Sequence, residues 1–290
     1  MSSTLSNTNQ KIGLALGGGG ARGFCHIPVL QKLEDLGLRP AQISGTSMGA
    51  IIGAIYAAGH SPKYIRDIVD SMVIYKGEGL KDIMQKSGLR KWFELVDPNF
   101  FSRGGVIKGD KVLEFLREII GVDTFEELQI PLSVVATDFH TGEQMIFDSG
   151  PLMPAVRASM SLPGLFEPVQ YQGRMLIDGG VVNPLPQDLL VGMDYVIAVD
   201  ASDLPQPEGK MPSMKDSLMG AVEIMGRQIS ERRCAANPPD IYLQPAFNGV
   251  EMTDFHKAGH VFACAQIVCD QLEQQLDKQL DKQLEKLPTK

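Results

Sequence analysis

The chain has 290 residues, with 27 lysines and arginines against 35 aspartates and glutamates, so its formal net charge is −8. An acidic chain has no excess of cations to displace counterions from phosphates, which argues against a nucleic-acid-binding protein and against broad adhesion to an anionic membrane. Hydrophobic residues make up 43% of the chain, as in an ordinary globular protein. We expect one large domain, with or without an appendage.

Cysteine usage and the N-terminal residues indicate the compartment. The four cysteines form no CxxC pair and no Cys/His cluster with zinc spacing, so neither disulfides nor a metal site is expected. Residues 1–10 lack the basic and apolar regions of a signal peptide and predict a disordered arm. The longest apolar stretch, Ala50 to Gly59, is too short to span a bilayer. We therefore expect a soluble, cytoplasmic protein.

The first part of the chain alternates strands and helices. Apolar runs predict strands at 12–16 and 41–46, each followed by a helical pattern, over 21–36 and 48–58. This order implies a parallel sheet with helices on both faces. Two more helices are then predicted, with a loop-rich aromatic stretch between them: 62–74, 109–120, and Trp92, Phe93, Phe100 and Phe101 in the loop.

The second part of the chain has more strand signals. Strands are predicted at 131–139, 144–147, 174–177, 194–199 and 241–243. The three prolines within 204–212 indicate a loop. Helices are predicted over 213–235 and from about 258 to 287.

The last predicted helix ends in the repeat QLEQ-QLDK-QLDK-QLEK. Leucines recur every four residues, so the stripe drifts about 40° around the helix per repeat and is not a heptad seam. The pattern favours a surface helix packed on its own domain, and a homo-oligomer formed through this helix is the alternative. Residues 247–290 are thus expected to be a helical extension of a domain formed by 11–246.

The first motif is the glycine run GGGGARG at residues 17–23, between a predicted strand and a predicted helix. Gly18, Gly20 and Gly23 have the GxGxxG spacing of a dinucleotide site. Such a site needs an acidic residue about 20 positions on, at the end of the second strand, and none is there. Stacked N–H groups at a helix start can instead hold an oxyanion, and we favour that interpretation.

The second motif is GTSMG at residues 45–49, a GxSxG sequence at a strand-to-helix junction. This pattern is typical of a nucleophile elbow, in which a sharp turn lifts the hydroxyl of Ser47 out of the sheet edge. Gly45 and Gly49 avoid side-chain collisions across the turn. The start of the following helix would favour the Ser47 alkoxide.

A nucleophilic serine needs a base. His256 or His260 could complete a Ser–Asp–His triad, but both lie in helical surroundings without a local motif. A carboxylate at a strand end is the alternative, and there are three: Asp138, Asp178 and Asp200. Asp178 is the strongest, because an apolar strand precedes it and Gly179 and Gly180 after it allow close backbone approach.

Together these motifs resemble the patatin-like phospholipase family. GGGGARG, GTSMG about 25 residues later, and the DGG of Asp178–Gly180 occur in that family's order, and RASMSLP at 157–163 also resembles its pattern. The resemblance covers about residues 11–200 and is closest in size to bacterial single-domain members. It implies a three-layer α/β/α sandwich with a mostly parallel central sheet, and a serine acyl hydrolase without metal or cofactor.

The resemblance also implies roles for individual residues. Ser47 would be the nucleophile and Asp178 the proton acceptor, with no histidine involved. Plant patatins begin the glycine motif with aspartate where this chain has Gly17, a departure that removes no required side chain. The oxyanion hole would be the glycine loop with an arginine beside it: Gly18, Gly19, Gly20 and Arg22. The expected substrates are lipid esters, either phospholipids or lysophospholipids, cleaved through an acyl-enzyme to release fatty acid.

Other functions and the mode of lipid contact stay open at this point. The alternatives are a triad esterase or thioesterase, and a lipid-binding regulatory module with little catalysis. The aromatic stretch with Trp92 is either core under loops or a lid that contacts lipid. Residues 76–111 hold eight basic and five acidic residues, a local +3, against −11 for the rest. This distribution suits an enzyme that touches a membrane or micelle surface transiently, peripheral at the inner membrane face.

Overall fold

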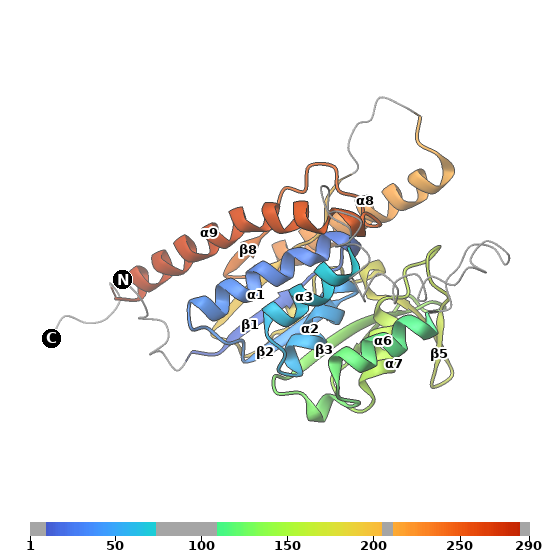
Figure 1. Ribbon diagram of the computed structural model, residues 1–290, viewed down its shortest axis with the longest axis horizontal. Coiled ribbons are helices and arrows are strands. Elements are labelled where there is room, and N and C mark those ends of the chain that lie inside the picture. The colour runs from blue at the N-terminus through green and yellow to red at the C-terminus, as the bar shows by residue number, and fades with distance from the viewer. Residues whose placement is uncertain (1–9, 74–108, 205–210, 285–290) are drawn as a thin grey trace.

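Short apolar runs form the central sheet of the protein. The structure is a computed structural model and describes residues 10–73, 109–204 and 211–284. The sheet has eight strands in the order β5-β6-β3-β2-β1-β7-β8, with β4 also paired to β3 (Figure 1). The strands are β1 Ile12–Leu16, β2 Gln42–Thr46, β3 Leu132–Asp138, β4 Gln144–Phe147, β5 Val169–Tyr171, β6 Arg174–Asp178, β7 Tyr195–Val199 and β8 Ile241–Leu243.

Strand direction divides the sheet into two parts. The pairs β3–β2, β2–β1, β1–β7 and β7–β8 are parallel, whereas β4 and β6 on β3, and β5 on β6, are antiparallel. Parallel strands are covered on both faces, which explains why every residue of β1 and β3 is buried. The predicted mostly parallel sheet is confirmed, with an antiparallel edge at β4, β5 and β6.

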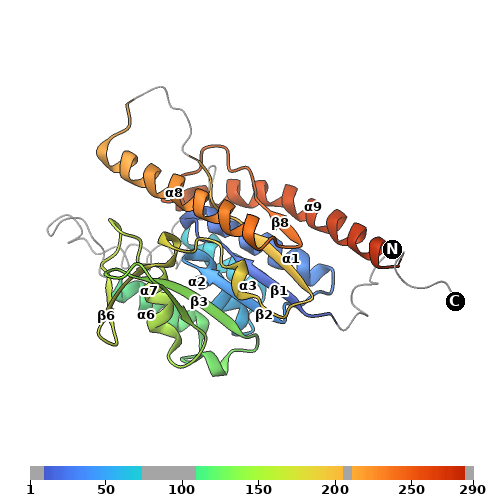
Figure 2. The ribbon, with the colours of Figure 1, turned by 180° about the vertical axis from the view of Figure 1, so that it is seen from behind.

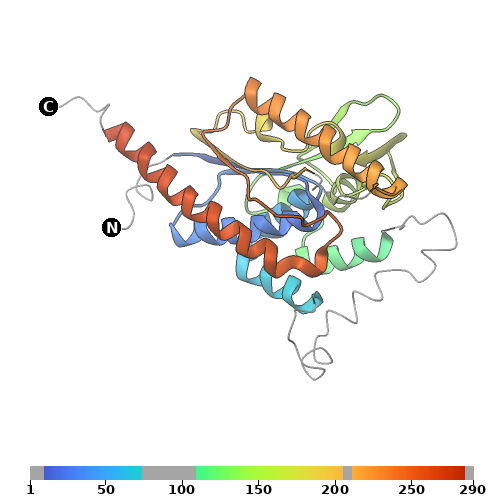
Figure 3. The ribbon, with the colours of Figure 1, turned by 90° about the horizontal axis from the view of Figure 1, so that it is seen from above.

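Helices cover both faces of the sheet unequally. They are α1 His26–Asp35, α2 Met48–Ala57, α3 Pro62–Met72, α6 Asp110–Ile120, α7 Leu152–Ser159, α8 Met214–Ala236 and α9 Ala258–Leu284. Helix α8 lies across one face, whereas α1, α3, α6 and α9 lie on the other (Figures 2 and 3). The larger core cluster lies between the sheet and these helices together with α2 and α7. The three-layer arrangement is therefore confirmed.

The structure differs from the sequence-based prediction at three elements. The helix predicted over 21–36 begins as a 3-10 turn, η2 Gly20–Cys25, before α1 starts. Helix α7 was not predicted because it has eight residues and contains Pro154, which is tolerated in the first turn of a helix. Strand β5 was missed because its hairpin turn is Gln172-Gly173, where φ is positive at both residues, instead of the usual Asn-Gly.

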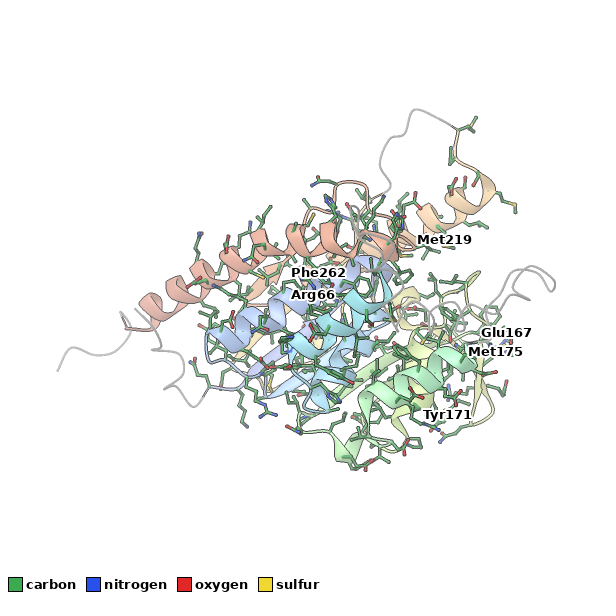
Figure 4. The ribbon with its side chains drawn as sticks, viewed as in Figure 1. Arg66, Glu167, Tyr171, Met175, Met219 and Phe262 are labelled. Carbon is green, nitrogen blue, oxygen red and sulfur yellow. The ribbon has the colours of Figure 1, made fainter. Side chains whose placement is uncertain are left out.

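The C-terminal helix packs on the body of the protein. Leu272 and Leu276 of the repeat are buried in the same core cluster as α1. On α3, the Arg66 guanidinium lies 3.6 Å from the ring centroid of Phe262 of α9 (Figure 4), a cation–π contact. The side chains of Leu280 and Leu284, the last two leucines of the repeat, are not among those that the structure describes. A homo-oligomer formed through α9 stays a prediction. Within the described ranges, no helix combines the length and apolarity needed to cross a membrane.

Gly49 allows α2 to lie against the end of β1, and this contact yields a stability prediction. A Cβ at Gly49 would overlap the Leu16 carbonyl, whereas a Cβ at Gly53 on the same helix would lie 3.3 Å from the Ile43 side chain. Overpacking of this kind costs about 1–3 kcal/mol or more, so Gly49→Ala should lower the free energy of unfolding by at least about 2 kcal/mol in urea titrations.

Gly53→Ala is the matched control, because it adds the same methyl group to the same helix. Its smaller clash is offset by the better helix propensity of alanine, so its effect should stay within about 1 kcal/mol. Equal effects of the two substitutions would contradict the packing described here.

Candidate active site

Ser47 is the single residue between β2 and α2, and the chain turns sharply there. Its φ is 54° and its ψ is −121°, a conformation that costs a non-glycine residue on the order of 1–3 kcal/mol. Backbone hydrogen bonds hold the turn: Ala50 and Ile51 donate to the Ser47 carbonyl at 3.0 and 3.1 Å. A Cβ at Gly45 would lie 2.7 Å from the Gly49 carbonyl, so the flanking glycines are required by close approach. The half-buried Ser47 side chain thus stands at the N-terminus of α2.

Asp178 ends β6 and is buried, with 2% of its surface exposed. Its Oδ1 accepts a hydrogen bond of 2.7 Å from the Gly180 amide. Its Oδ2 is buried without a hydrogen-bond partner among the described residues, although the Ser47 side chain is near enough to interact with the carboxylate. Gly179 allows this turn to pass over β3, since a Cβ there would overlap the Val135 carbonyl.

Sheet register explains why these two residues meet. Thr46 of β2 pairs with Val135 of β3, and the next residue of β3, Ala136, pairs with Asp178 of β6. Ser47 follows Thr46 directly, so the register places Ser47 and Asp178 on either side of β3 at the same height. The other two strand-end aspartates are engaged elsewhere: Asp138 with Arg174 at 3.0 Å and Asp200 with the Tyr242 hydroxyl at 2.6 Å.

Burial dominates the electrostatics of Asp178. Loss of solvation raises its pKa from 3.8 to about 6, and the Gly180 hydrogen bond and the nearby Ser47 side chain, which both lower the pKa, do not offset that increase. The sequence left open whether Arg22 would lower this pKa. Instead, the Arg22 guanidinium donates to Glu223 of α8 at 2.8 Å. At neutral pH the Asp178 carboxylate is mostly ionised and can accept a proton from a neighbouring hydroxyl.

The end of α7 and the turn that follows it hold both Ser47 and Asp178 in place. The Ser47 amide donates to Ser159 Oγ at 2.9 Å, and the Asp178 amide donates to the Ser161 carbonyl at 3.0 Å. The buried Arg157 donates to Ser161 Oγ at 2.6 Å and to the Glu167 carbonyl at 3.0 Å. The RASMSLP segment was recognised from sequence, but this connection was not, because no local pattern reveals a contact between residues 112 positions apart.

The glycine loop lies next to Ser47. A Cβ at Gly18 would be 3.2 Å from Ser47 Cβ, but the Gly18 amide already donates to the Pro184 carbonyl at 2.8 Å. In the described part of the chain, the Gly19 and Gly20 amides donate to no other group. These two N–H groups are thus open to an anion beside Ser47. A Cβ at Gly23 would meet the Met48 side chain at 2.5 Å, so this glycine lets η2 pack on α2.

A cavity of about 450 Å³ joins Ser47, Asp178 and the glycine loop to the interior. Most of its lining is apolar. Helices α2, α3 and α6 contribute apolar side chains to it, among them Ile51, Ile55, Ile65, Val69, Phe115 and Ile119. Its polar side includes the buried pair Arg22–Glu223. Burial raises the pKa of Glu223, and Arg22 opposes that rise. The cavity can hold an apolar chain whose polar end lies beside Ser47.

No histidine reaches this cavity. All five histidines lie within the described residues, and none is among the lining residues. His260 contacts the Phe247 carbonyl at 3.2 Å, and His256 is exposed. His26 is buried against the Gly17 carbonyl at 2.8 Å, and burial lowers its pKa to about 4. The geometry therefore offers no partner for a serine–histidine triad.

The sequence also suggested aromatic residues that contact the substrate, and it suggested no metal site. Trp92, Phe93, Phe100 and Phe101, the expected substrate contacts, lie outside the described residues. Among the residues that are described, no group of three or more histidine, cysteine, aspartate or glutamate side chains could hold a metal ion.

Burial of Asp178 predicts a pH-dependent stability difference. A carboxyl whose pKa is raised from 3.8 to about 6 destabilises the fold when ionised, a cost that is present above pH 6 and absent below pH 4. Asp178→Asn removes this cost, so at pH 8 the variant should be more stable than the wild type by about 1–3 kcal/mol. Urea unfolding from pH 4 to 8 would measure the difference.

The exposed Asp148 provides the matched control for this experiment. Asp148→Asn should change stability by less than about 0.5 kcal/mol at every pH. If the difference between the Asp178→Asn variant and the wild type does not change with pH, the raised pKa is refuted.

Known proteins match the part of the chain that contains the motifs around Ser47 and Asp178. A family model described as patatin-like phospholipase matches residues 14–191. An uncharacterised NTE family protein of Mycobacterium tuberculosis is 37% identical over 195 residues, which are 67% of this chain and 49% of that protein. Lysophospholipase NTE1 of Debaryomyces hansenii is 27% identical over 91% of this chain and 18% of its own length. The chain thus spans about half or less of these curated relatives.

A solved structure resembles the fold. VipD from Legionella pneumophila superposes with a TM-score of 0.51 at 17% sequence identity, covering 91% of this chain and 67% of VipD. At this identity the likeness concerns the fold alone.

Proposed function

The chain belongs to the patatin-like phospholipase family, and on this basis we propose that it is a serine acyl hydrolase of the phospholipase A or lysophospholipase type. The observation that carries the proposal is the meeting of Ser47, on a strained turn, with the buried carboxylate of Asp178 at one end of an apolar cavity. The absence of a histidine from the cavity lining favours a two-residue mechanism over a triad.

The proposed reaction runs through an acyl-enzyme. Ser47 Oγ attacks the ester carbonyl while its proton passes to Asp178. The tetrahedral oxyanion accepts hydrogen bonds from the Gly19 and Gly20 amides, each worth about 3–4 kcal/mol in well-studied hydrolases. Collapse breaks the bond to the leaving alcohol, which takes the proton from Asp178. Water then attacks the acyl group and gives a proton to Asp178. Collapse breaks the ester bond to Ser47, whose oxygen takes that proton back from Asp178, and the fatty acid is released.

Several features support a lipid ester as the substrate. The apolar lining of the cavity fits a hydrocarbon chain, and one relative carries the name lysophospholipase. A thioester would undergo the same acyl transfer and is the second candidate substrate. A regulatory module without catalysis is disfavoured, because Ser47, Asp178 and the open Gly19 and Gly20 amides all lie at the same cavity. Access to lipid would occur by transient contact with a membrane or micelle surface.

The dyad predicts which substitutions abolish hydrolysis. Ser47→Ala and Asp178→Asn should each lower kcat on a p-nitrophenyl ester by at least about 10³-fold, since each removes a group that forms or breaks a bond. A panel of phospholipids, lysophospholipids, acylglycerols and acyl-CoA, with Ser47→Ala as the blank, would identify the substrate class.

The double variant His256→Ala/His260→Ala is the control, and it should keep a near-normal rate. A loss of activity in that variant comparable to the loss in Asp178→Asn would support a triad and contradict the dyad.

The pKa of Asp178 sets the expected pH dependence of activity. Only the ionised carboxylate accepts the Ser47 proton, so kcat/KM should fall about tenfold per pH unit below the pKa of about 6. Rates on a soluble ester from pH 4.5 to 8.5 would show this acidic limb. Activity that stays constant down to pH 4.5 would mean that Asp178 is not a base with a raised pKa.

A further inference from the structure

The cavity has an inner arm that runs along α2 from Ser47. Met48, Ile51, Ile52 and Ile55 of this helix line it at successive turns. Ile55 is eight residues after Ser47, and at 1.5 Å of rise per residue the arm extends for about 12 Å. Residues of α3 and α6 complete its wall. The arm is therefore a channel between three helices, with the nucleophile at one end.

The directions of α2, α3 and α6 place Ile55, Ile65 and Ile119 together at the end of the arm that is far from Ser47. Helix α3 begins at Pro62, shortly after the end of α2, so Ile65 in its first turns lies near Ile55. The C-terminus of α6 is tied to the same end, because the His60 ring Nε2 lies 3.0 Å from the Ile120 carbonyl. Ile119, one residue earlier on α6, thus joins Ile55 and Ile65 as a lining residue.

This end of the arm is closed. Ile55, Ile65 and Ile119 are 3%, 2% and 9% exposed, so they have little contact with solvent. Behind them, the His60 ring stacks on Tyr64 with centroids 4.4 Å apart. The hydrogen bond between His60 and the Ile120 carbonyl ties the loop after α2 to the end of α6. A chain entering from Ser47 therefore meets a wall of side chains.

We propose that Ile55, Ile65 and Ile119 form a floor that limits the acyl chain to about ten carbons, a length determinant that rests on the proposed function. An extended hydrocarbon advances about 1.25 Å per carbon, given C–C bonds of about 1.5 Å, so about 12 Å accommodates roughly ten carbons. Each methylene buried in the arm should raise kcat/KM by up to about fourfold. Carbons beyond the floor must stay outside the arm or displace packed side chains.

A series of p-nitrophenyl esters with saturated chains of four to sixteen carbons tests the floor. In the wild type, kcat/KM should rise up to about ten carbons and then level off or fall. Ile119→Ala opens the floor, so its ratio of kcat/KM for the fourteen-carbon over the ten-carbon ester should rise by about four- to sixteenfold, as expected for one or two more buried methylenes.

Ile120→Ala is the matched control, because Ile120 is the adjacent isoleucine on α6, is 1% exposed, and does not line the cavity. It should leave the ratio within about twofold. The ratio compares two substrates on one sample, so it does not depend on the fraction of folded protein. A wild type that cleaves the sixteen-carbon ester as well as the ten-carbon one, or equal shifts in both variants, would overturn the proposal.

Different experimental results would contradict the floor and the proposed function. If the wild type cleaves no ester, the proposed function fails, and the floor is tested by binding of saturated fatty acids that displace a fluorescent fatty acid. Affinity that stops rising near ten carbons in the wild type, but at a longer chain in Ile119→Ala, supports the floor. Affinity that continues to rise up to sixteen carbons in the wild type overturns it.

Discussion

The burial of the Asp178 carboxylate is the constraint on which the rest of the site depends. A free carboxyl is a weak base, and without a histidine the serine needs a stronger one. Here the loss of solvation raises the pKa to about 6, near the range in which a base both stays ionised and accepts protons. The apolar cavity that removes water from Asp178 is also the surface that would hold an acyl chain. In the proposed mechanism, base strength and substrate binding thus share one physical cause.

Backbone contacts keep Ser47 and Asp178 together. Ser47 stays in a strained conformation because Ser159 accepts its amide hydrogen and α2 packs closely on β1 at Gly49. Two residues after Ser159, in the turn after α7, the Ser161 carbonyl accepts the Asp178 amide. A change at the end of α7 would therefore move Ser47 and Asp178, the proposed nucleophile and base, at once. The unpaired Oδ2 of Asp178, within the part of the chain that is described, is the atom left available for the serine proton.

Local patterns predicted much of the fold and the central residues of the site, whereas long-range contacts could not be predicted. Apolar runs and glycines at turns placed the strands β1, β4 and β8 and the motifs around Ser47 and Asp178, because these signals lie within a few residues of each other. The pairing of Arg22 with Glu223, 201 residues apart, has no local signal. The same holds for the Gly18 amide, which donates to Pro184 and leaves Gly19 and Gly20 as the open donors.

The central claim is that Ser47 is activated by Asp178 alone, and reaction with a fluorophosphonate tests it most directly. Peptide mapping after labelling should find the adduct on Ser47 in the wild type and in the His256→Ala/His260→Ala variant, with labelling much slower in Asp178→Asn. An adduct on another serine, or a labelling rate in Asp178→Asn equal to that of the wild type, would contradict the account.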